Sequence, residues 1–333
     1  MTILIALLAF GVMIGVHEAG HLLAAKLSGV LVHEFAIGMG PKLISWQGKE
    51  TKYSLRLLPI GGYCNLEGEN GGSDNTRAFC NAKRWQKLWI LASGAIMNLV
   101  LGFILLICFY AGMETVPEPV VSNVIAGTPA QQMQLQKGDR IVKMNDSDID
   151  IYPDLKFFLQ KNGTNPFDLT IERDGKEIVI KDFKPYTEDA NVLLGIQIST
   201  PKNSVSHTIK NAYHMEFFMG KIVLSGLWEL ATGDVSIKEA SGPVGIVNEV
   251  GKAAESGWMD LFYIIALITI NLGLFNLLPI PALDGGRILF VLISMIIRRD
   301  VPEKVETAFH TIGMLLLLAL MLFITFNDVG RIF

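Results

Sequence analysis

Three polar residues inside an apolar segment are the first feature that could carry chemistry. His17, Glu18 and His21 form the pattern His-Glu-x-x-His within residues 3–27. Helical positions four apart share a face, so both imidazoles can bind one metal ion. Two imidazoles and one carboxylate leave the fourth position of zinc open, and zinc lowers the pKa of water bound there to about 7. The pattern therefore predicts a zinc site at which Glu18 acts on water.

A third ligand is predicted at Asp284, far along the chain. Residues 276–286 read Asn-Leu-Leu-Pro-Ile-Pro-Ala-Leu-Asp-Gly-Gly. The two prolines stop regular helix and place an extended turn at the end of an apolar run. The commoner role of an aspartate in such a place is to cap the next helix. We expect a ligand instead, because the run before Asp284 and the run that carries the histidines reach the same depth from the same side.

Four apolar runs are long enough to position these residues within a bilayer. They cover residues 3–27, 88–113, 261–283 and about 308–326. The hydrophobic fraction of 50% is too high for two water-facing domains in 333 residues. The first run lacks the basic start and the cleavage site of a signal peptide, so we expect it to be retained. A net charge of -4 without a lysine-rich tail argues against nucleic acid as a partner.

Two further apolar stretches are not predicted to span. Residues 288–297 are too few to cross a bilayer and suit a buried or interfacial helix. Residues 213–231 mix apolar and charged side chains. This mixture is typical of an amphipathic helix on a membrane surface, and an ordinary packed helix fits equally well.

The distribution of lysine and arginine predicts the direction of the spans. Basic residues gather in residues 30–87 and in the loop before the fourth span, whereas residues 113–132 contain none. The basic loops should face the cytosol, which puts both termini and the middle of the chain outside. Spans one and three then run the same way. His17 lies fourteen residues after Ile3, or about 21 Å into a core roughly 30 Å thick, so the metal should lie towards the cytosolic side.

Two motifs carry a resemblance to a known family. Val-His-Glu-Ala-Gly-His in span one and the Asn-to-Gly-Gly segment ending span three resemble the site-2 protease family of intramembrane metalloproteases, in particular its bacterial regulator-of-sigma-E protease branch. The resemblance implies that His17, His21 and Asp284 bind one zinc ion per chain. It also implies that Glu18 is the catalytic base.

Two asparagines match family positions. Asn276 matches an asparagine that holds the substrate backbone in the family, and a hydrogen bond between helices is the alternative. Asn98, in Ser-Gly-Ala-Ile-Met-Asn of span two, resembles the family's Gly-xxx-Asn pattern, with Ala95 where proline is usual. We expect a structural role for Asn98.

The loop after span one is predicted to form strands. Residues 35–46 and 51–64 alternate apolar and polar side chains, which indicates short strands between glycine-rich turns such as Gly61-Gly62. A free strand edge could pair with an extended substrate. The resemblance implies that residues 33–66 form a β-loop dipping into the membrane beside the zinc, whereas the residues alone fit a cytosolic hairpin equally well.

A small α/β domain is predicted outside the membrane, over residues 120–200. Residues 127–146 resemble a bacterial PDZ domain, with a helix after Pro129, a Lys137-Gly138-Asp139 turn and a strand over 140–144. Residues 169–173 and 177–180 should form a hairpin through Asp174-Gly175. We expect this domain to exclude bulky substrates rather than bind peptide. Residues 241–246, Ser-Gly-Pro-Val-Gly-Ile, match a further family motif without a predicted chemical role.

The fold expected is a polytopic α-helical membrane protein with four transmembrane helices, a membrane-associated β-loop and an inserted extracytoplasmic PDZ-like α/β domain. Its predicted parts are residues 1–119 and 258–333 for the halves of the membrane domain, 120–200 for the PDZ-like domain and 201–257 for an amphipathic linker.

The function expected is zinc-dependent cleavage of a transmembrane segment in a bacterial inner membrane. The resemblance suggests a pre-cleaved anti-sigma factor or signal-peptide remnants as substrate, with the lipid bilayer as the other partner. A membrane-anchored PDZ scaffold does not explain polar residues inside a span. A zinc transporter would explain buried ligands, but four spans and a helix-breaking Asp-Gly-Gly end suit a closed three-ligand site better than a transport path. A prenyl-protein endopeptidase also uses His-Glu-x-x-His in membranes, but neither the PDZ-like region nor the Leu-Asp-Gly ligand belongs to it.

Overall fold

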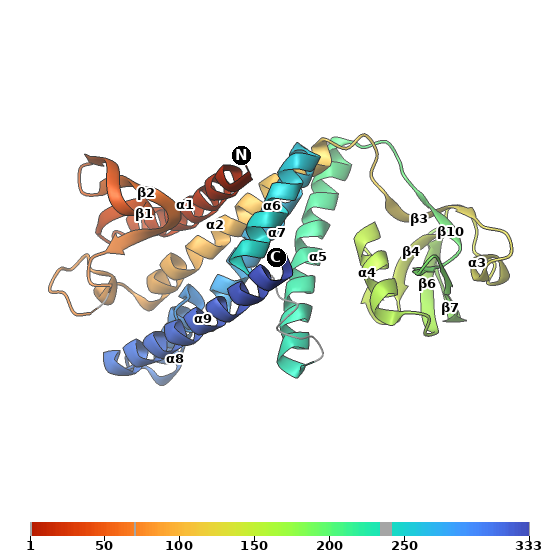
Figure 1. The fold of residues 1–333 in the computed structure, drawn as a ribbon. Helices are drawn as coiled ribbons and strands as arrows, with labels where there is room; N and C mark the ends of the chain where they lie inside the picture. Colours follow the sequence, from red (N-terminus) through yellow and green to blue (C-terminus); the bar gives the residue numbers. More distant parts are fainter. Residues whose placement is uncertain (1, 70, 234–241, 333) are drawn as a thin grey trace. The chain divides into compact units, whose positions relative to one another are not determined.

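The computed structural model describes residues 2–69, 71–233 and 242–332 of the chain. The chain forms two compact units. One consists of Met1–Leu105 with Gly220–Phe333, and the other of Leu106–Met219. The first unit contains the apolar helices and a long hairpin, and the second contains an antiparallel sheet with short helices (Figure 1).

Candidate membrane spans occur at all four predicted places in the described residues. They lie in α1 (Thr2–Leu27), α2 (Arg84–Ala111), α7 (Trp258–Leu277) and α9 (Glu303–Ile332). Large apolar side chains on these helices are exposed, including Leu8 at 59%, Leu316 at 66% and Phe326 at 78%. Such surfaces are stable in lipid rather than in water. Helix α7 ends at Leu277, earlier than the apolar run 261–283, because Pro279 and Pro281 follow.

Shorter helices surround the candidate spans. The predicted helix over 288–297 is confirmed as part of α8 (Asp284–Ile297). The stretch 213–231 lies in α5 (Val205–Thr232), which begins earlier than predicted. Helix α6 (Pro243–Ser256) and the short 3₁₀ helix η1 (Phe79–Asn81) complete the helices of the first unit.

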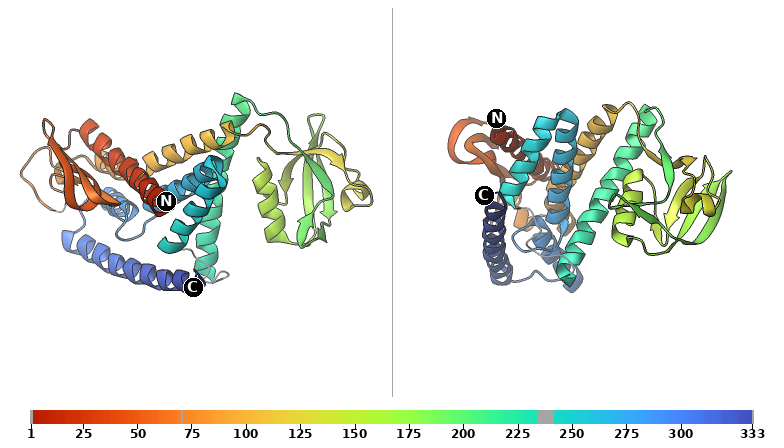
Figure 2. Two further views of the ribbon diagram at one scale, coloured as in Figure 1. Left: turned by 45° about the horizontal axis from the view of Figure 1, so that its top comes forward. Right: turned by 45° about the vertical axis from the view of Figure 1, so that its right-hand side comes forward.

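Helix α7 begins beside the start of α1. Ala6, Val250 and Leu261 form a buried apolar cluster that joins the first turns of α1 and α7 through α6. Helix α2 packs against α7 in the opposite direction. A Cβ at Gly273 would lie 3.0 Å from the carbonyl oxygen of Ala95, whereas one at Gly102, later in α2, would overlap Ile270, earlier in α7. Figure 2 shows these helices from two further sides.

The predicted strands after α1 form one long antiparallel hairpin. Strands β1 (Val32–Gln47) and β2 (Lys52–Leu66) pair with each other and pack against α1 (Figure 1). The prediction of a turn at Gly61-Gly62 was wrong. Both residues lie inside β2, where Gly61 has φ +83° and the pairing register shifts. A glycine there permits a β-bulge, whereas the turn of the hairpin is at residues 48–51.

The second unit is built around a six-stranded sheet in the described residues. The strand order is β10-β3-β4-β6-β7, with β5 paired to β4. The bounds are β3 (Glu118–Val124), β4 (Arg140–Met144), β5 (Ser147–Asp148), β6 (Phe167–Arg173), β7 (Lys176–Phe183) and β10 (Ile196–Ser199). Two short strands, β8 (Tyr186–Glu188) and β9 (Asn191–Leu193), form a separate hairpin, and helices α3 (Pro129–Gln132) and α4 (Tyr152–Asn162) complete the unit.

Several sequence predictions for this unit are confirmed. Strand β4 has the predicted bounds, α3 begins at Pro129, and β6 pairs with β7 through the Asp174-Gly175 turn. Both turn residues have positive φ, at +52° and +73°, as a two-residue hairpin loop of type I′ requires.

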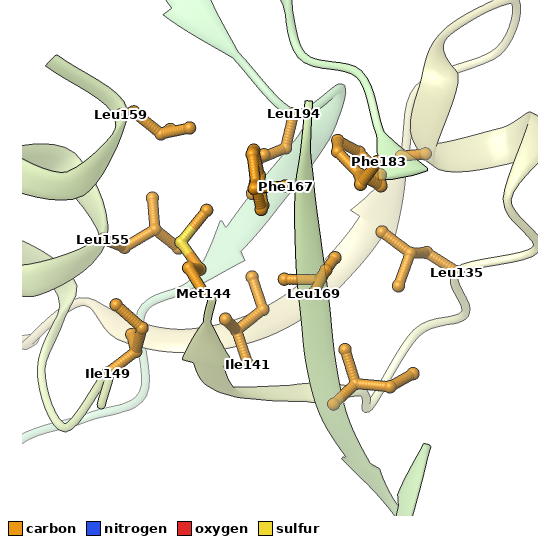
Figure 3. Close-up of a cluster of buried hydrophobic side chains, with 12 residues drawn as sticks. Leu135, Ile141, Met144, Ile149, Leu155, Leu159, Phe167, Leu169, Phe183 and Leu194 are labelled. Carbon is orange, nitrogen blue, oxygen red and sulfur yellow. The ribbon is translucent and has the colours of Figure 1, made fainter. Parts of the chain in front are cut away.

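The core of the second unit lies between the sheet and α4. Leu155 and Leu159 of α4 face Met144 and Leu169 of the sheet, and Phe167 lies near Phe183 (Figure 3). Burial of each such side chain contributes roughly 1.5–3 kcal/mol.

A partly buried ion pair lies at one end of this sheet. Arg173 Nε donates to Asp139 Oδ1 at 2.6 Å, and the Asp139 side chain is 1% exposed. The last residue of the predicted Lys-Gly-Asp turn therefore has a structural partner on β6.

The Ser-Gly-Pro-Val-Gly-Ile motif lies at the start of helix α6, which a carboxylate from α9 caps. Ser241 lies outside the described residues. The backbone N–H groups of Gly242 and Gly245, at the start of α6, donate to the carboxylate of Asp328 in α9 at 3.2 and 2.9 Å. A carboxylate at a helix N-terminus satisfies N–H groups that have no partner within the helix and interacts favourably with the helix dipole. The motif thus joins the fourth candidate span to α6.

Replacing Asp328 should weaken this junction. Asp328→Ala is expected to lower the free energy of unfolding by about 1 kcal/mol, because the cap of α6 is lost. Thermal unfolding in detergent micelles measures the change as a lower melting temperature. Asp146→Ala, at an exposed carboxylate, is the matched control and should melt like the unsubstituted protein. Identical melting of both variants would show that the cap is not stabilising.

Candidate metal centre

Helices α1 and α8 bring three potential metal ligands together. His17 Nε2 lies 3.1 Å and His21 Nε2 lies 3.2 Å from Asp284 Oδ2. The two Nε2 atoms are 3.2 Å apart. A search of the described residues for histidine, cysteine and acidic side chains whose ligand atoms could share one ion finds these three residues. The sequence prediction named the same three residues.

The triangle of ligand atoms fits a tetrahedral zinc ion. Nitrogen and oxygen ligands lie about 2.0–2.2 Å from zinc, so two of them at the tetrahedral angle are about 3.3 Å apart. Asp284 Oδ2 is buried and makes no hydrogen bond, even though two imidazole nitrogens lie within 3.2 Å. A buried carboxylate oxygen without a donor is costly unless a cation satisfies it. The residues present therefore fit a zinc ion.

Hydrogen bonds to α2 orient the two imidazoles. His21 Nδ1 lies 2.7 Å from the carbonyl oxygen of Ile90, to which a protonated Nδ1 donates. That bond places the proton on Nδ1 and leaves the lone pair of Nε2 free for a metal. His17 Nδ1 lies 3.2 Å from the side-chain amide of Asn98.

A glycine in α2 leaves the space that the metal ligands need. A Cβ at Gly94 would overlap His21 Nε2 and would lie 2.8 Å from His17 Nε2. Real Cβ atoms do not approach other heavy atoms so closely, so a side chain here would displace both imidazoles. Gly94 and Asn98 are the two ends of the Gly-xxx-Asn pattern in span two.

The segment that carries Asp284 is held by the fourth candidate span. After α7 ends, Ala282 adopts φ +67°, and its N–H donates to His310 Nδ1 of α9 at 2.9 Å. The N-cap of α8 is Leu283, and Asp284 is the first helical residue. The capping alternative for Asp284 is therefore wrong, because its carboxylate is turned to the histidines.

A cavity of about 750 Å³ adjoins the three ligands. Glu18 lines it together with residues 62–66 of β2. Glu69 and Arg287, which form an ion pair, lie on its wall. Cys64 also lines the cavity, and burial raises the pKa of its thiol, so this sulfur stays protonated near neutral pH. Glu18, next to His17 in α1, thus offers a carboxylate to this cavity, whereas the Glu69 carboxylate is paired with Arg287.

Asn276 lies away from this cavity. Its Nδ2 donates to the carbonyl oxygen of Leu272, one turn earlier in α7, at 2.9 Å. The amide is used within its own helix, and Asn276 is not among the residues that line the cavity. Within the described residues, this amide makes no hydrogen bond to another helix. Asn276 is also not on the cavity wall, where a residue that holds substrate would be expected.

Sequence reasoning missed Gly94 and His310 and did not assign Asn98 to the metal centre. His310 lies inside the fourth apolar run, where an ionisable residue is a functional candidate by default, and this signal could have identified it. Gly94 and Asn98 are separated by one helical turn, which places them on one face of α2. Because both residues are far from the histidines in sequence, no local pattern predicts the contact.

Comparison with known proteins agrees with this geometry. The profile of peptidase family M50 matches residues 5–320. The chain belongs to peptidase family M50. This family contains the site-2 proteases, so the resemblance drawn from the two motifs is confirmed.

Relatives of the M50 protease are named as zinc metalloproteases. One from Clostridium acetobutylicum is 40% identical over 329 residues, which covers 98% of this chain and 97% of the relative. One from Clostridium perfringens is 37% identical over 99% of this chain and 98% of its own length. One from Fusobacterium nucleatum is 37% identical over the whole length of both. The M50 protease is a metalloprotease with zinc as its cofactor, rather than a scaffold or a transporter.

Proposed function

We propose that the M50 protease hydrolyses a peptide bond within a transmembrane segment of a single-span protein. His17, His21 and Asp284 are the proposed zinc ligands, and Glu18 is the proposed catalytic base. The observation that carries the proposal is the set of three ligand atoms, 3.1–3.2 Å apart, of which two belong to a candidate membrane span. Polar side chains in such a segment are costly and are retained for function.

Each residue has a defined part in the hydrolysis. Zinc, when bound, acts as a Lewis acid and makes water nucleophilic near neutral pH. Glu18 accepts a proton from the water that attacks the carbonyl carbon of the substrate. It then donates this proton to the amide nitrogen that leaves as the C–N bond breaks. Ile90 and the α2 face keep the imidazoles in the orientation that this chemistry needs.

The hairpin supplies an edge for an extended substrate. A transmembrane helix hides its peptide bonds in internal hydrogen bonds, so a substrate must unwind before hydrolysis. Residues 62–66 of β2 line the cavity, and β1 and β2 form a sheet of two strands in the described residues. The backbone of an extended segment could pair with a free edge of this hairpin, which would hold the scissile bond near the ligands. Asn276 is a weaker candidate for holding the substrate backbone.

The proposed location is a bacterial inner membrane. Basic residues cluster in residues 30–87, which supports a cytosolic side for the hairpin and the metal and an outer side for both termini. The sheet of the second unit is then extracytoplasmic. We take it as a PDZ-like domain that excludes substrates with bulky external parts. A pre-cleaved anti-sigma factor or a signal-peptide remnant has the required form, and the lipid bilayer is the other partner.

Mapping the cleaved bond tests this function. Single-span substrates with soluble tags at both ends are incubated with purified protease in liposomes, and the products are measured by mass spectrometry. We expect cleavage inside the apolar segment, and faster cleavage when a helix-breaking residue is placed there, because local unwinding becomes easier. Protein carrying Glu18→Gln gives the background rate of cleavage in this assay. Cleavage confined to the soluble tags would contradict the proposal.

A further inference from the structure

One row of α2 contacts both histidines of the metal centre. Ile90, Gly94 and Asn98 follow one another at intervals of four residues and therefore share a face of the helix. The carbonyl oxygen of Ile90 lies 2.7 Å from His21 Nδ1. Gly94 leaves space beside both Nε2 atoms. Asn98, about two turns after Ile90, has its side-chain amide 3.2 Å from His17 Nδ1, the atom that corresponds to His21 Nδ1.

Zinc binding through Nε2 of an imidazole determines the protonation of Nδ1 in the same ring, and with it the need for a hydrogen-bond acceptor. A neutral imidazole carries one proton, so a ring that gives the lone pair of Nε2 to a metal must carry its proton on Nδ1. That N–H is a buried donor and requires an acceptor. His21 has the carbonyl oxygen of Ile90. His17 has the side-chain amide of Asn98 beside the corresponding atom.

The amide of Asn98 can supply this acceptor after a half turn. Asn98 is fully buried, and its Oδ1 makes no hydrogen bond while Nδ2 faces His17. The two ends of an asparagine amide differ only in their hydrogen bonding, and the network decides which end faces which neighbour. Turning the amide gives the Nδ1–H of His17 an acceptor and gives the buried Oδ1 a donor.

The hydrogen bond between α7 and α2 at this level does not use the Asn98 amide. Thr269 of α7 contacts α2 at the backbone carbonyl oxygen of Asn98, with Oγ1 at 3.4 Å. The buried amide is therefore left for His17. A polar side chain buried in a candidate span without such a use would only be a cost.

We propose that Asn98 is a positioning residue whose Oδ1 accepts the Nδ1–H of His17 and thereby sets the zinc affinity of the site. The inference rests on the proposed role of His17 as a zinc ligand. Partners of this kind orient a ligand imidazole and raise its basicity, and their loss typically lowers metal affinity by about 10- to 100-fold. Both residues of the Gly-xxx-Asn pattern then serve the metal ligands. Its glycine makes room for the ligands, and its asparagine holds one of them.

Zinc affinity of Asn98 variants tests the inference. The full-length protein in detergent is titrated with zinc in competition with a chromogenic chelator. Asn98→Leu keeps a similar volume without an acceptor, so we expect zinc affinity to fall by about 10- to 100-fold. Asn98→Asp keeps the acceptor and should bind zinc within about 3-fold of the unsubstituted protein, because carboxylates commonly accept from ligand histidines. Thr269→Val removes a neighbouring polar group and should leave the affinity unchanged.

The melting temperature of zinc-free protein separates a binding effect from misfolding. We expect Asn98→Leu to lose much of the melting-temperature increase that zinc produces, whether or not the zinc-free form is destabilised. Asn98→Ala provides a second variant without an acceptor if the leucine variant does not fold. Unchanged zinc affinity in the leucine or alanine variant would overturn the inference, as would an aspartate variant as weak as leucine. If the unsubstituted protein binds no zinc, the proposed function itself fails.

Discussion

Purified protein carrying Glu18→Gln is expected to hold one zinc ion per chain and to cleave its substrate about 10²- to 10⁴-fold more slowly. Glutamine has nearly the same shape as glutamate but cannot accept the proton of the attacking water, and this range is typical for loss of a general base. Glu18 is not one of the three ligand residues, so the metal should stay. Metal analysis and cleavage rates of the same preparation measure both quantities.

A matched substitution controls for loss of a carboxylate elsewhere. Glu249 is exposed on α6, where it pairs with Lys252. Glu249→Gln should cleave at the rate of the unsubstituted protein. Zinc loss from Glu18→Gln would assign Glu18 a role in binding metal, and undiminished cleavage would remove it from the mechanism.

Gly94→Ala is expected to empty the metal centre. The added methyl group would overlap His21 Nε2 and would lie 2.8 Å from two ring atoms of His17, so the imidazoles must move apart or α2 must retreat. Zinc needs its ligands within about 0.2 Å of ideal distances. We therefore expect far less than one zinc per chain and no measurable cleavage, as determined by metal analysis of purified protein and by the substrate assay.

Gly102→Ala separates this effect from general overpacking. Gly102 also lies on α2, and a methyl group there would overlap Ile270 of α7 rather than a metal ligand. Overpacking of this kind costs roughly 1–3 kcal/mol of stability. The variant should melt at a lower temperature and still bind one zinc per chain. Equal zinc loss in both variants would mean that helix separation, and not the ligand space beside Gly94, controls the site.

Much of the fold could be predicted because local patterns carry it. Candidate spans are long apolar runs, and the hairpin at Asp174-Gly175 follows from residues that tolerate positive φ. The position of Gly61-Gly62 could not be decided in this way, because two glycines suit a tight turn and a β-bulge equally. Pairing between β1 and β2 decides that they form a bulge.

Part of the metal centre could likewise be predicted from local patterns. The spacing of His17 and His21 places them on one helix face, and the direction of the spans together with two prolines leads to Asp284. These inferences need only helical periodicity and a count of crossings.

The sequence by itself determined the candidate chemistry of this protein, since residue types, helical spacing and the direction of the spans pick out three potential zinc ligands and a proposed base. Only the tertiary structure decided how they are held. Asn98 meets His17, His310 meets Ala282 and Asp328 meets Gly242 across long separations in the chain. Such partners are selected when helices pack, because a buried polar group must find a partner among whatever side chains or backbone atoms lie opposite, and no local pattern specifies those neighbours.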